Sequence, residues 1–205
     1  MYKIKTMSVY EKLFALQTAY NAHTNITRIS SREDFYLKHI EDSLALLPII
    51  DADIERSRSI RLFDLGAGAG YPGLPLAIER PELRVTLNDA TLKKIKYVQS
   101  VIDALPLPNA AAVWGRAEIL SQQKEHKGQY DFVTARAVAE LQELVQFAAP
   151  FLRAGGRALF MKAKNVETEI SAAKRAAAKC GLSLLDVTKY KLAEMDRAIV
   201  VYVKQ

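Results

Sequence analysis

Two acidic residues and a glycine-rich stretch are the groups in this chain best suited to chemistry. Residues 62–75 read LFDLGAGAGYPGLP, with four glycines and two prolines directly after a short apolar run. Glycine permits positive φ and lets a ligand approach the main chain with no Cβ in the way. Asp64 lies two residues before Gly66, and Asp89 lies 19 residues after Gly70, at the end of the next apolar run. This arrangement predicts a ligand site between two carboxylates.

The charges of these two residues indicate the class of ligand. Residues 68–73 match G-x-G-x-x-G, so a nicotinamide dinucleotide is one alternative and a purely structural tight turn is another. A carboxylate at Asp64 would repel a pyrophosphate and would favour a ligand that carries an ammonium or sulfonium charge. Asp89 has the position of the acidic residue that binds a ribose diol. The spacing therefore favours S-adenosylmethionine over NAD.

The elements that must position this site alternate between strand and helix patterns. Strand-like runs cover residues 60–65, 83–89, 111–115, 130–137, 156–163, 182–192 and 197–204. Helical patterns separate most of them, which predicts right-handed βαβ units and a parallel sheet. No helix separates the last two runs, so they should pair as an antiparallel hairpin. The fold expected is an α/β, Rossmann-like sheet of seven strands, parallel except for its last strand.

Residues 1–59 are expected to form an N-terminal helical extension, and residues 60–205 the main domain. Apolar residues recur at helical spacing in residues 10–20 and 35–47, and the polar residues 51–59 are expected to join the two parts.

Composition limits the partners and the chemistry. The 205 residues carry a formal net charge of +6, which favours an anionic partner, with nucleic acid ahead of a membrane. A basic protein with no polyanionic partner is the alternative. Cys180 is the only cysteine, so neither a disulfide framework nor a thiolate metal cluster is expected, and the three histidines have no metal-binding spacing. We find no signal peptide or membrane span, so we expect a cytoplasmic protein, with a monomer favoured.

Eight short motifs occur in the order typical of one enzyme family. They are NIT (25–27), HIEDS (39–43), DLGAGAGYPGLPLAI (64–78), LNDATLKKIKYV (87–98), GRAE (115–118), ARA (135–137), MKAK (161–164) and Arg197 before IVV. Over nearly its whole length the chain resembles the RsmG (GidB) family of bacterial methyltransferases. The resemblance implies a class I methyltransferase fold and S-adenosylmethionine as cofactor. It also implies methyl transfer to N7 of a guanine in the decoding-region loop of 16S ribosomal RNA, on free rRNA or on the small subunit.

The resemblance also implies roles for individual residues. Tyr71 would close over the cofactor, Asp89 would bind the ribose hydroxyls, and Ala117 with Glu118 would flank the adenine. The methionine part would lie on the glycine loop, with Asp64, Gly66, Gly68 and Gly70. Asn88 departs from the family pattern, which has an apolar residue before the acidic one.

Guanine N7 carries a free lone pair, so the reaction needs no general base, and we expect no catalytic residue in that sense. Arg136 follows the fourth predicted strand and is expected to be a positioning residue that holds the cofactor carboxylate or an RNA phosphate. The structural alternative is an ion pair with a neighbouring carboxylate such as Glu140. His39 is expected to dock the extension over the site.

Basic residues near the expected site are candidates for RNA binding. They are Arg28, Lys93, Lys94, Lys96, Lys162 and Lys164. A methyltransferase for another RNA or a small molecule, and a non-catalytic RNA-binding module with this fold, remain alternatives.

Overall fold

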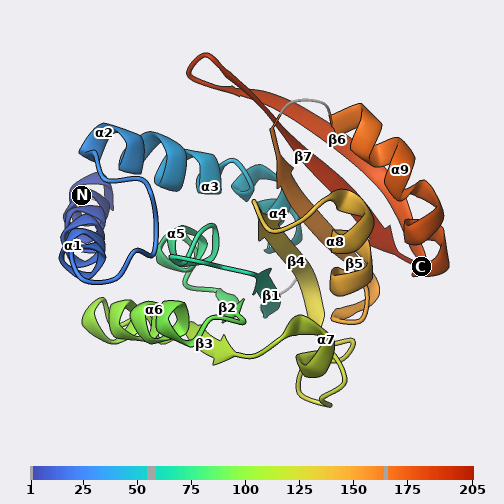
Figure 1. Cartoon of the computed structure of the whole chain (residues 1–205), viewed down its shortest axis with the longest axis horizontal. Helices are drawn as coiled ribbons and strands as arrows, with labels where there is room; N and C mark the ends of the chain where they lie inside the picture. The colour runs from blue at the N-terminus through green and yellow to red at the C-terminus, as the bar shows by residue number, and fades with distance from the viewer. Residues whose placement is uncertain (1, 55–58, 164–165) are drawn as a thin grey trace.

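The computed structural model describes residues 2–54, 59–163 and 166–205, with side chains described from Val9 onward. Within these residues one sheet of seven strands has the order β3-β2-β1-β4-β5-β7-β6 (Figure 1). The strands are β1 (Ile60–Leu65), β2 (Leu83–Asp89), β3 (Ala110–Trp114), β4 (Tyr130–Arg136), β5 (Leu152–Lys162), β6 (Leu182–Leu192) and β7 (Met195–Lys204). Strands β1 to β5 pair in parallel, and β7 runs antiparallel to both β5 and β6. The predicted sheet, with its terminal hairpin, is confirmed.

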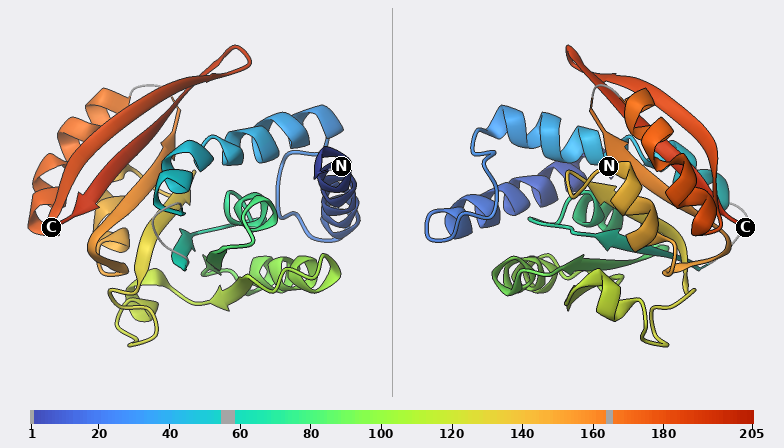
Figure 2. Two further views of the ribbon diagram at one scale, coloured as in Figure 1. Left: turned by 180° about the vertical axis from the view of Figure 1, so that it is seen from behind. Right: turned by 45° about the vertical axis from the view of Figure 1, so that its right-hand side comes forward.

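Helices cover both faces of the sheet because each strand alternates apolar residues between the two faces. Leu62 packs in a cluster with α5 (Gly73–Glu79) and α6 (Leu92–Ala104), while the next residue, Phe63, packs in a second cluster on the other face. That second cluster includes residues of α7 (Ala117–Leu120), α8 (Leu141–Ala148) and α9 (Val166–Lys179). Figure 2 shows α6 and the N-terminal helices gathered on one side of the molecule, and α9 with the β6–β7 hairpin on the other.

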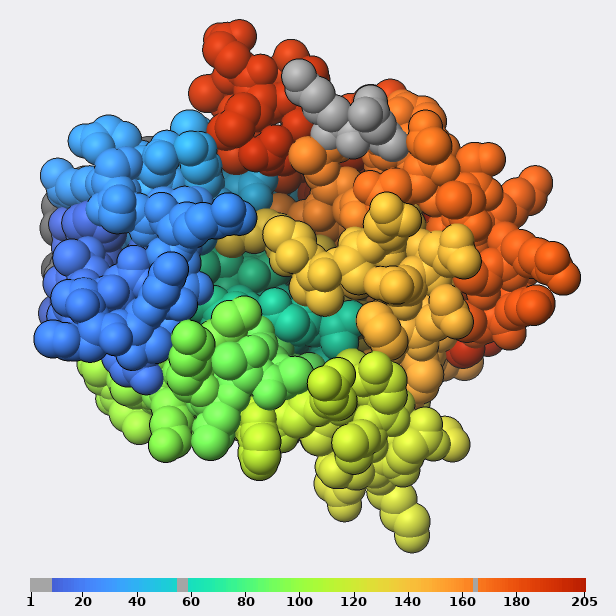
Figure 3. Space-filling view, in the orientation of Figure 1, coloured from blue at the N-terminus to red at the C-terminus, as the bar shows by residue number. Residues whose placement is uncertain are grey.

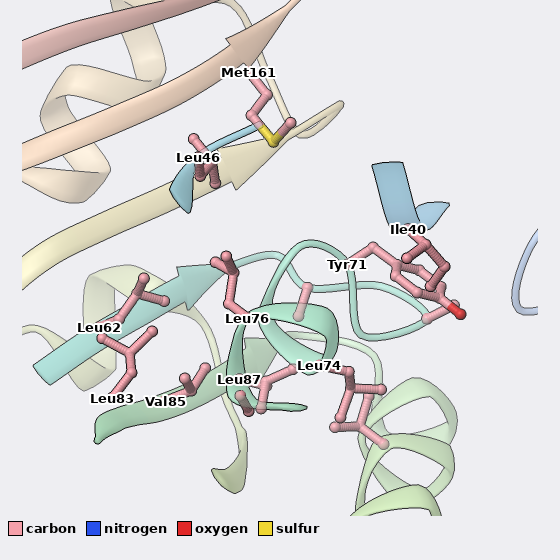
Figure 4. Close-up of a cluster of buried hydrophobic side chains, with 14 of the residues drawn as sticks. Ile40, Leu46, Leu62, Tyr71, Leu74, Leu76, Leu83, Val85, Leu87 and Met161 are labelled. Atoms are coloured by element: carbon pink, nitrogen blue, oxygen red, sulfur yellow. The ribbon is translucent and has the colours of Figure 1, made fainter. Parts of the chain in front are cut away.

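The N-terminal extension is a series of helices that pack onto the first face of the sheet. They are α1 (Tyr2–Asn21), α2 (Arg32–Asp34), the π-helical segment η1 (Phe35–Glu41), α3 (Asp42–Leu44) and α4 (Leu47–Ile54). Their buried side chains, including Phe35, Ile40 and Leu46, belong to the same hydrophobic cluster as Leu62 and Leu87 of the sheet. Figure 4 shows Ile40 over the glycine loop beside Tyr71, and Leu46 beside Met161 of β5.

One expected boundary differs from the structure. Residues 51–54 were expected to begin a polar join, but they complete α4, in which Ile50 is fully buried. The remaining residues 55–58 of the expected join lie outside the described part of the chain. The division of the chain at residue 59 stays a prediction.

Candidate functional site

The glycine loop connects β1 to α5 and presents main chain at the carboxyl edge of the sheet. Gly66, Gly68 and Gly70 have φ of +67°, +62° and +93°, a region that side chains with a Cβ rarely adopt. The Ala67 N–H donates to the Asn88 carbonyl at 2.7 Å, which ties the loop to the end of β2. A Cβ added at Gly68 would meet no atom nearer than 3.9 Å, so space is open beside this residue.

Asp64 lies beneath this loop. Its side chain has no exposed surface, and its two oxygens accept hydrogen bonds from the Gly73 N–H at 2.8 Å and the Thr134 hydroxyl at 3.1 Å. Burial raises the pKa of this carboxyl to about 7, although both hydrogen bonds favour the charged form. The chain therefore encloses Asp64, and its contact with a cationic ligand stays a prediction. Asp64 instead holds the first turn of α5 against β1 and β4.

Asp89 lies at the open side of the loop. One carboxylate oxygen accepts from the Gly68 N–H at 3.1 Å and from Lys94 Nζ at 3.4 Å, and the other accepts from the Thr91 N–H at 2.8 Å. An ionised carboxylate has about four lone-pair sites, so acceptor capacity remains for a further donor. The order β3-β2-β1-β4 places Asp89 between the loop and the residues that follow β3.

The connection after β3 holds Ala117 and Glu118 at this same edge. Asn88 donates to the carbonyls of Val113 at 3.1 Å and Gly115 at 2.9 Å, which fixes the start of the connection. Asn88 therefore has a structural role that an apolar residue could not perform. Ala117 is half-buried and Glu118 is exposed at the start of α7.

Arg136, the last residue of β4, binds the extension. Its Nη1 donates to the Lys38 carbonyl at 2.6 Å and to Asp42 Oδ2 at 2.9 Å, and its Nη2 lies 3.1 Å from His39 Nδ1. The ion pair of the structural alternative is therefore present, but its carboxylate is Asp42 and not Glu140. Sequence proximity favoured Glu140, whereas Asp42 lies 94 positions away along the chain.

The contacts of His39 confirm that this residue docks the extension, as expected. Since guanidinium groups only donate, Nδ1 must accept from Arg136, and Nε2–H then donates to the Thr27 hydroxyl at 3.2 Å. The ring also stacks on Tyr71, with the centroids 3.9 Å apart. Burial, and then the charge of Arg136, lower the pKa of His39 to about 3, so the imidazole is neutral at physiological pH.

Tyr71 does not cover the open side of the loop. Its side chain is 3% exposed, and its hydroxyl donates to Gln17 Oε1 of α1 at 2.8 Å. The Arg136 guanidinium carbon lies 5.6 Å from the centroid of its ring. The side chain points into the extension and anchors the loop there, and the closure of Tyr71 over a cofactor stays a prediction.

A cavity of about 590 Å³ lies between the extension and the ends of β4, β5 and β7. Residues that line it include Arg28, His39, Asp42, Arg136, Lys162 and Arg197. Asp42 connects the extension to several strands, because it also accepts a hydrogen bond from the Tyr190 hydroxyl at 2.8 Å and lies 3.7 Å from Arg197 Nε. Asp42 lies in the HIEDS motif, but no role for its side chain was expected from the sequence. In Figure 3, the teal part of the chain is recessed between the blue extension, the green residues near 95 and the gold residues near 140.

The basic residues expected to bind RNA have different environments. Arg28, Lys93 and Lys96 are exposed. Lys162 departs from the expectation, because its side chain is only 13% exposed and its Nζ lies 2.6 Å from Glu169 Oε2. Lys164 lies outside the described residues.

Metal-binding clusters and membrane-spanning helices were also considered in the sequence. No cluster of three or more histidine, cysteine, aspartate or glutamate residues suited to a metal ion occurs in this part of the chain. Among the helices that the structure describes, none is both long and apolar enough to cross a membrane.

Solved structures define the class of the fold. Fibrillarin of Aeropyrum pernix, solved with natively bound S-adenosyl-L-methionine, superposes with a TM-score of 0.58 and 18% identity, over 72% of this chain and 67% of that one. A TehB-like SAM-dependent methyltransferase from Corynebacterium glutamicum superposes with a TM-score of 0.56 and 19% identity, over 80% and 88% of the two chains. The chain therefore has the Rossmann-like fold of class I methyltransferases.

Sequence comparison then identifies the family. The family model described as GidB, rRNA small subunit methyltransferase G, matches residues 4–200. The ribosomal RNA small subunit methyltransferase G of Streptococcus pneumoniae (serotype 19F, strain G54) is 39% identical over 196 residues, which cover 96% of this chain and 81% of that protein. This chain belongs to the rRNA small subunit methyltransferase G family.

Proposed function

We propose that this protein transfers a methyl group from S-adenosylmethionine to N7 of a guanine in the decoding-region loop of 16S ribosomal RNA. The observation that carries the proposal is the Asp89 carboxylate, which is hydrogen-bonded to the Gly68 N–H beside an open glycine loop. Family membership supports rRNA of the small subunit as the substrate.

The hydrogen bonds of the loop favour this cofactor over a dinucleotide. The N–H groups of three loop glycines already have acceptors: Asp89 for Gly68, the Ala67 carbonyl for Gly70, and Asp64 for Gly73. A pyrophosphate would require such N–H groups to be free. A ribose, in contrast, requires acceptors, and Asp89 retains capacity to accept from a hydroxyl once the 3.4 Å contact with Lys94 is released.

Each of the remaining site residues has a place in the proposal. Gly66, Gly68 and Gly70 offer main chain to the methionine part, while Ala117 packs against the adenine and the exposed Glu118 accepts from its amino group. Asp64 and Tyr71 act from beneath and behind the loop as positioning residues. When bound, the cofactor supplies a methyl group on a positively charged sulfur, which is open to attack by a lone pair.

The chain itself has to orient the reactants and exclude water. Neither a general base nor a metal ion is required, because N7 of guanine has no proton to lose. Orientation alone is worth roughly 7–11 kcal/mol when the reacting atoms are held in line. Arg136 is fixed on three sides by the extension and faces the cavity, where it holds a cofactor carboxylate or an RNA phosphate.

We further propose that the protein acts as a monomer in the cytoplasm. Its substrate is 16S rRNA, either free or within the small subunit. Exposed Arg28, Lys93 and Lys96 would meet the phosphate backbone at the rim of the site. The net charge of +6 and the family support the contacts with RNA.

The decisive experiment is mass spectrometry of 16S rRNA from a strain that lacks this protein. We expect the loss of one 7-methylguanosine, and its restoration when the purified protein and S-adenosylmethionine are added to small subunits from that strain. A methylated guanine that persists in the deletion strain would overturn the substrate assignment. Calorimetric binding of NADH in place of S-adenosylmethionine would overturn the cofactor assignment.

A further inference from the structure

Trp114 is a large aromatic side chain that remains on the surface. It is the only tryptophan in the chain and the last residue of β3, and it is 58% exposed. Its indole N–H donates to the Ala90 carbonyl at 3.0 Å, so the ring is held in one place. The polar atom of this tryptophan is therefore already bonded, and its apolar ring is left uncovered by the described residues.

The ring lies close to the proposed cofactor site but on the other face of β3 from the residues proposed to hold the adenine. Trp114 pairs in register with Asp89. Ala112 packs in the cluster that contains α6, whereas Val113 and Ala117 pack in the cluster on the opposite face. Because side chains alternate along a strand, Trp114 shares the α6 face with Ala112.

Exposed apolar and basic residues follow the carboxyl ends of β2 and β3, the edge of the sheet at which Trp114 lies. Leu92, the first residue of α6, is 44% exposed, and Lys93, Lys96 and Arg116 are all exposed. Within the described residues, the structure records no ion pair for these three cations. Unpaired cations at the same edge of the sheet as an exposed aromatic ring match a single-stranded nucleic acid, whose bases stack on aromatic rings while its phosphates meet lysine and arginine.

We propose that Trp114 stacks on an unpaired nucleobase of the rRNA that neighbours the methylated guanine, while Lys93 and Arg116 bind the phosphates on either side. This inference rests on the proposed function and adds a residue that positions the RNA. Stacking on a neighbouring base fixes the register of the strand, so that only one guanine reaches the methyl donor.

The first test is the methylation kinetics of Trp114→Ala and Trp114→Phe with small subunits from the deletion strain. Stacking on a base is worth about 1–3 kcal/mol by alanine substitution, which corresponds to a rise in KM for the RNA of roughly 5- to 150-fold. Trp114→Phe loses the bond to Ala90 but keeps a ring, so its KM should stay within about threefold of the wild type. Leu185→Ala is the matched control, because Leu185 is 55% exposed on β6, and it should leave KM unchanged.

Cofactor binding separates RNA stacking from a structural role. Calorimetry should give the same affinity for S-adenosylmethionine in the wild type and both variants. An unchanged KM for RNA in Trp114→Ala would overturn the inference, as would an equal loss of cofactor affinity in both Trp114 variants. Absence of any methyl transfer by the wild-type protein would instead overturn the proposed function, and this inference with it.

Tryptophan emission gives a second readout that does not depend on a variant folding well. Because Trp114 is the sole tryptophan, excitation at long ultraviolet wavelength reports this ring alone. A saturable quench by a single-stranded, guanine-containing RNA oligonucleotide, with little change on S-adenosylmethionine alone, would support the inference. Strong quenching by the cofactor alone would show that Trp114 contacts the adenine, and an unaltered spectrum at saturating RNA would exclude stacking.

Discussion

At the scale of single residues, Asp89 is where the glycine loop, the end of β2 and the proposed ribose site meet. Replacement by asparagine removes one acceptor oxygen and the negative charge while it preserves shape. Hydrogen bonds to charged groups are worth about 1.5–3 kcal/mol, so we expect Asp89→Asn to weaken S-adenosylmethionine binding by roughly 10- to 100-fold in calorimetry.

The matched control for this variant is Asp103→Asn. Asp103 is exposed on α6 and accepts a hydrogen bond from the Gln99 side-chain amide. It should bind the cofactor as the wild type does. Equal affinities in the wild type and Asp89→Asn would remove Asp89 from the binding site.

The pKa of His39 makes the stability of the protein depend on pH. This pKa is about 3 in the folded protein and 6.5 in an unfolded chain, and the difference fixes the sign of the dependence. Between these values the unfolded chain binds a proton that the folded protein does not. Stability therefore falls as the pH drops from about 6.5 towards 3, and His39 contributes no slope above that range. His39 alone should account for about 2 kcal/mol of the stability lost between pH 7 and pH 5.

Urea unfolding of the wild type and His39→Gln at both pH values tests this contribution. Glutamine can still accept from Arg136 and donate to Thr27, but it does not titrate. The variant should lose less stability on acidification than the wild type does. Parallel profiles for the two proteins would show that His39 is protonated in the folded state.

At the scale of elements, Asp42 joins three parts of the fold that are far apart in sequence. It comes from the extension and contacts Arg136 of β4, Tyr190 of β6 and Arg197 of β7. The side chains of Asp42 and Arg136 are 7% and 16% exposed, so the pair is shielded from water. Removal of one partner from such a pair is costly because a poorly hydrated charge remains.

We expect Asp42→Asn to lower the free energy of unfolding by about 3 kcal/mol, and Tyr190→Phe to lower it by about 1 kcal/mol. Asp34→Asn is the control, because Asp34 forms an exposed pair with Lys38 in the same segment and should cost less than about 0.5 kcal/mol. Urea unfolding measures all three. An Asp42→Asn variant no weaker than Asp34→Asn would mean that Asp42 does not hold the elements together.

The elements themselves could be predicted from the sequence, whereas the contacts between them could not. Periods of two and of 3.6 residues mark strands and helices locally, and glycines at 66, 68 and 70 mark the loop. The partner of Arg136 depends on how the extension docks, and nothing near Arg136 in sequence encodes that. The contacts of Tyr71 and Lys162 could not be predicted for the same reason, since their partners, Gln17 and Glu169, come from helices that pack only in the finished fold.

At the scale of the whole molecule, the extension and the sheet share one hydrophobic cluster, so we expect them to unfold together. Leu13 of α1 is fully buried in that cluster. Leu13→Ala should lower the free energy of unfolding by roughly 2–5 kcal/mol without splitting the transition.

Two probes measured in urea check this cooperativity. Far-ultraviolet circular dichroism reports all helices, and the emission of Trp114 reports β3, which lies at the opposite edge of the sheet from the hairpin. The two transitions should coincide in the wild type and in Leu13→Ala. An early loss of helical signal with unchanged emission would instead show that residues 1–59 fold as a separate domain.

The π-helical turn at Phe35–Glu41 has a genetic consequence. The Asp42 N–H reaches back to the Leu37 carbonyl, so this turn holds one residue more than an α-helical turn does. An in-frame deletion of a single codon, such as that of Tyr36, would allow the segment to close as an ordinary α-helix. Because the deletion removes the extra residue that the wide turn accommodates, His39 and Asp42 would keep roughly their orientation toward Arg136. Alleles of this kind should still support rRNA modification, whereas deletion of one codon within an ordinary α-helix such as α6 would rotate every later side chain of that helix by about 100°.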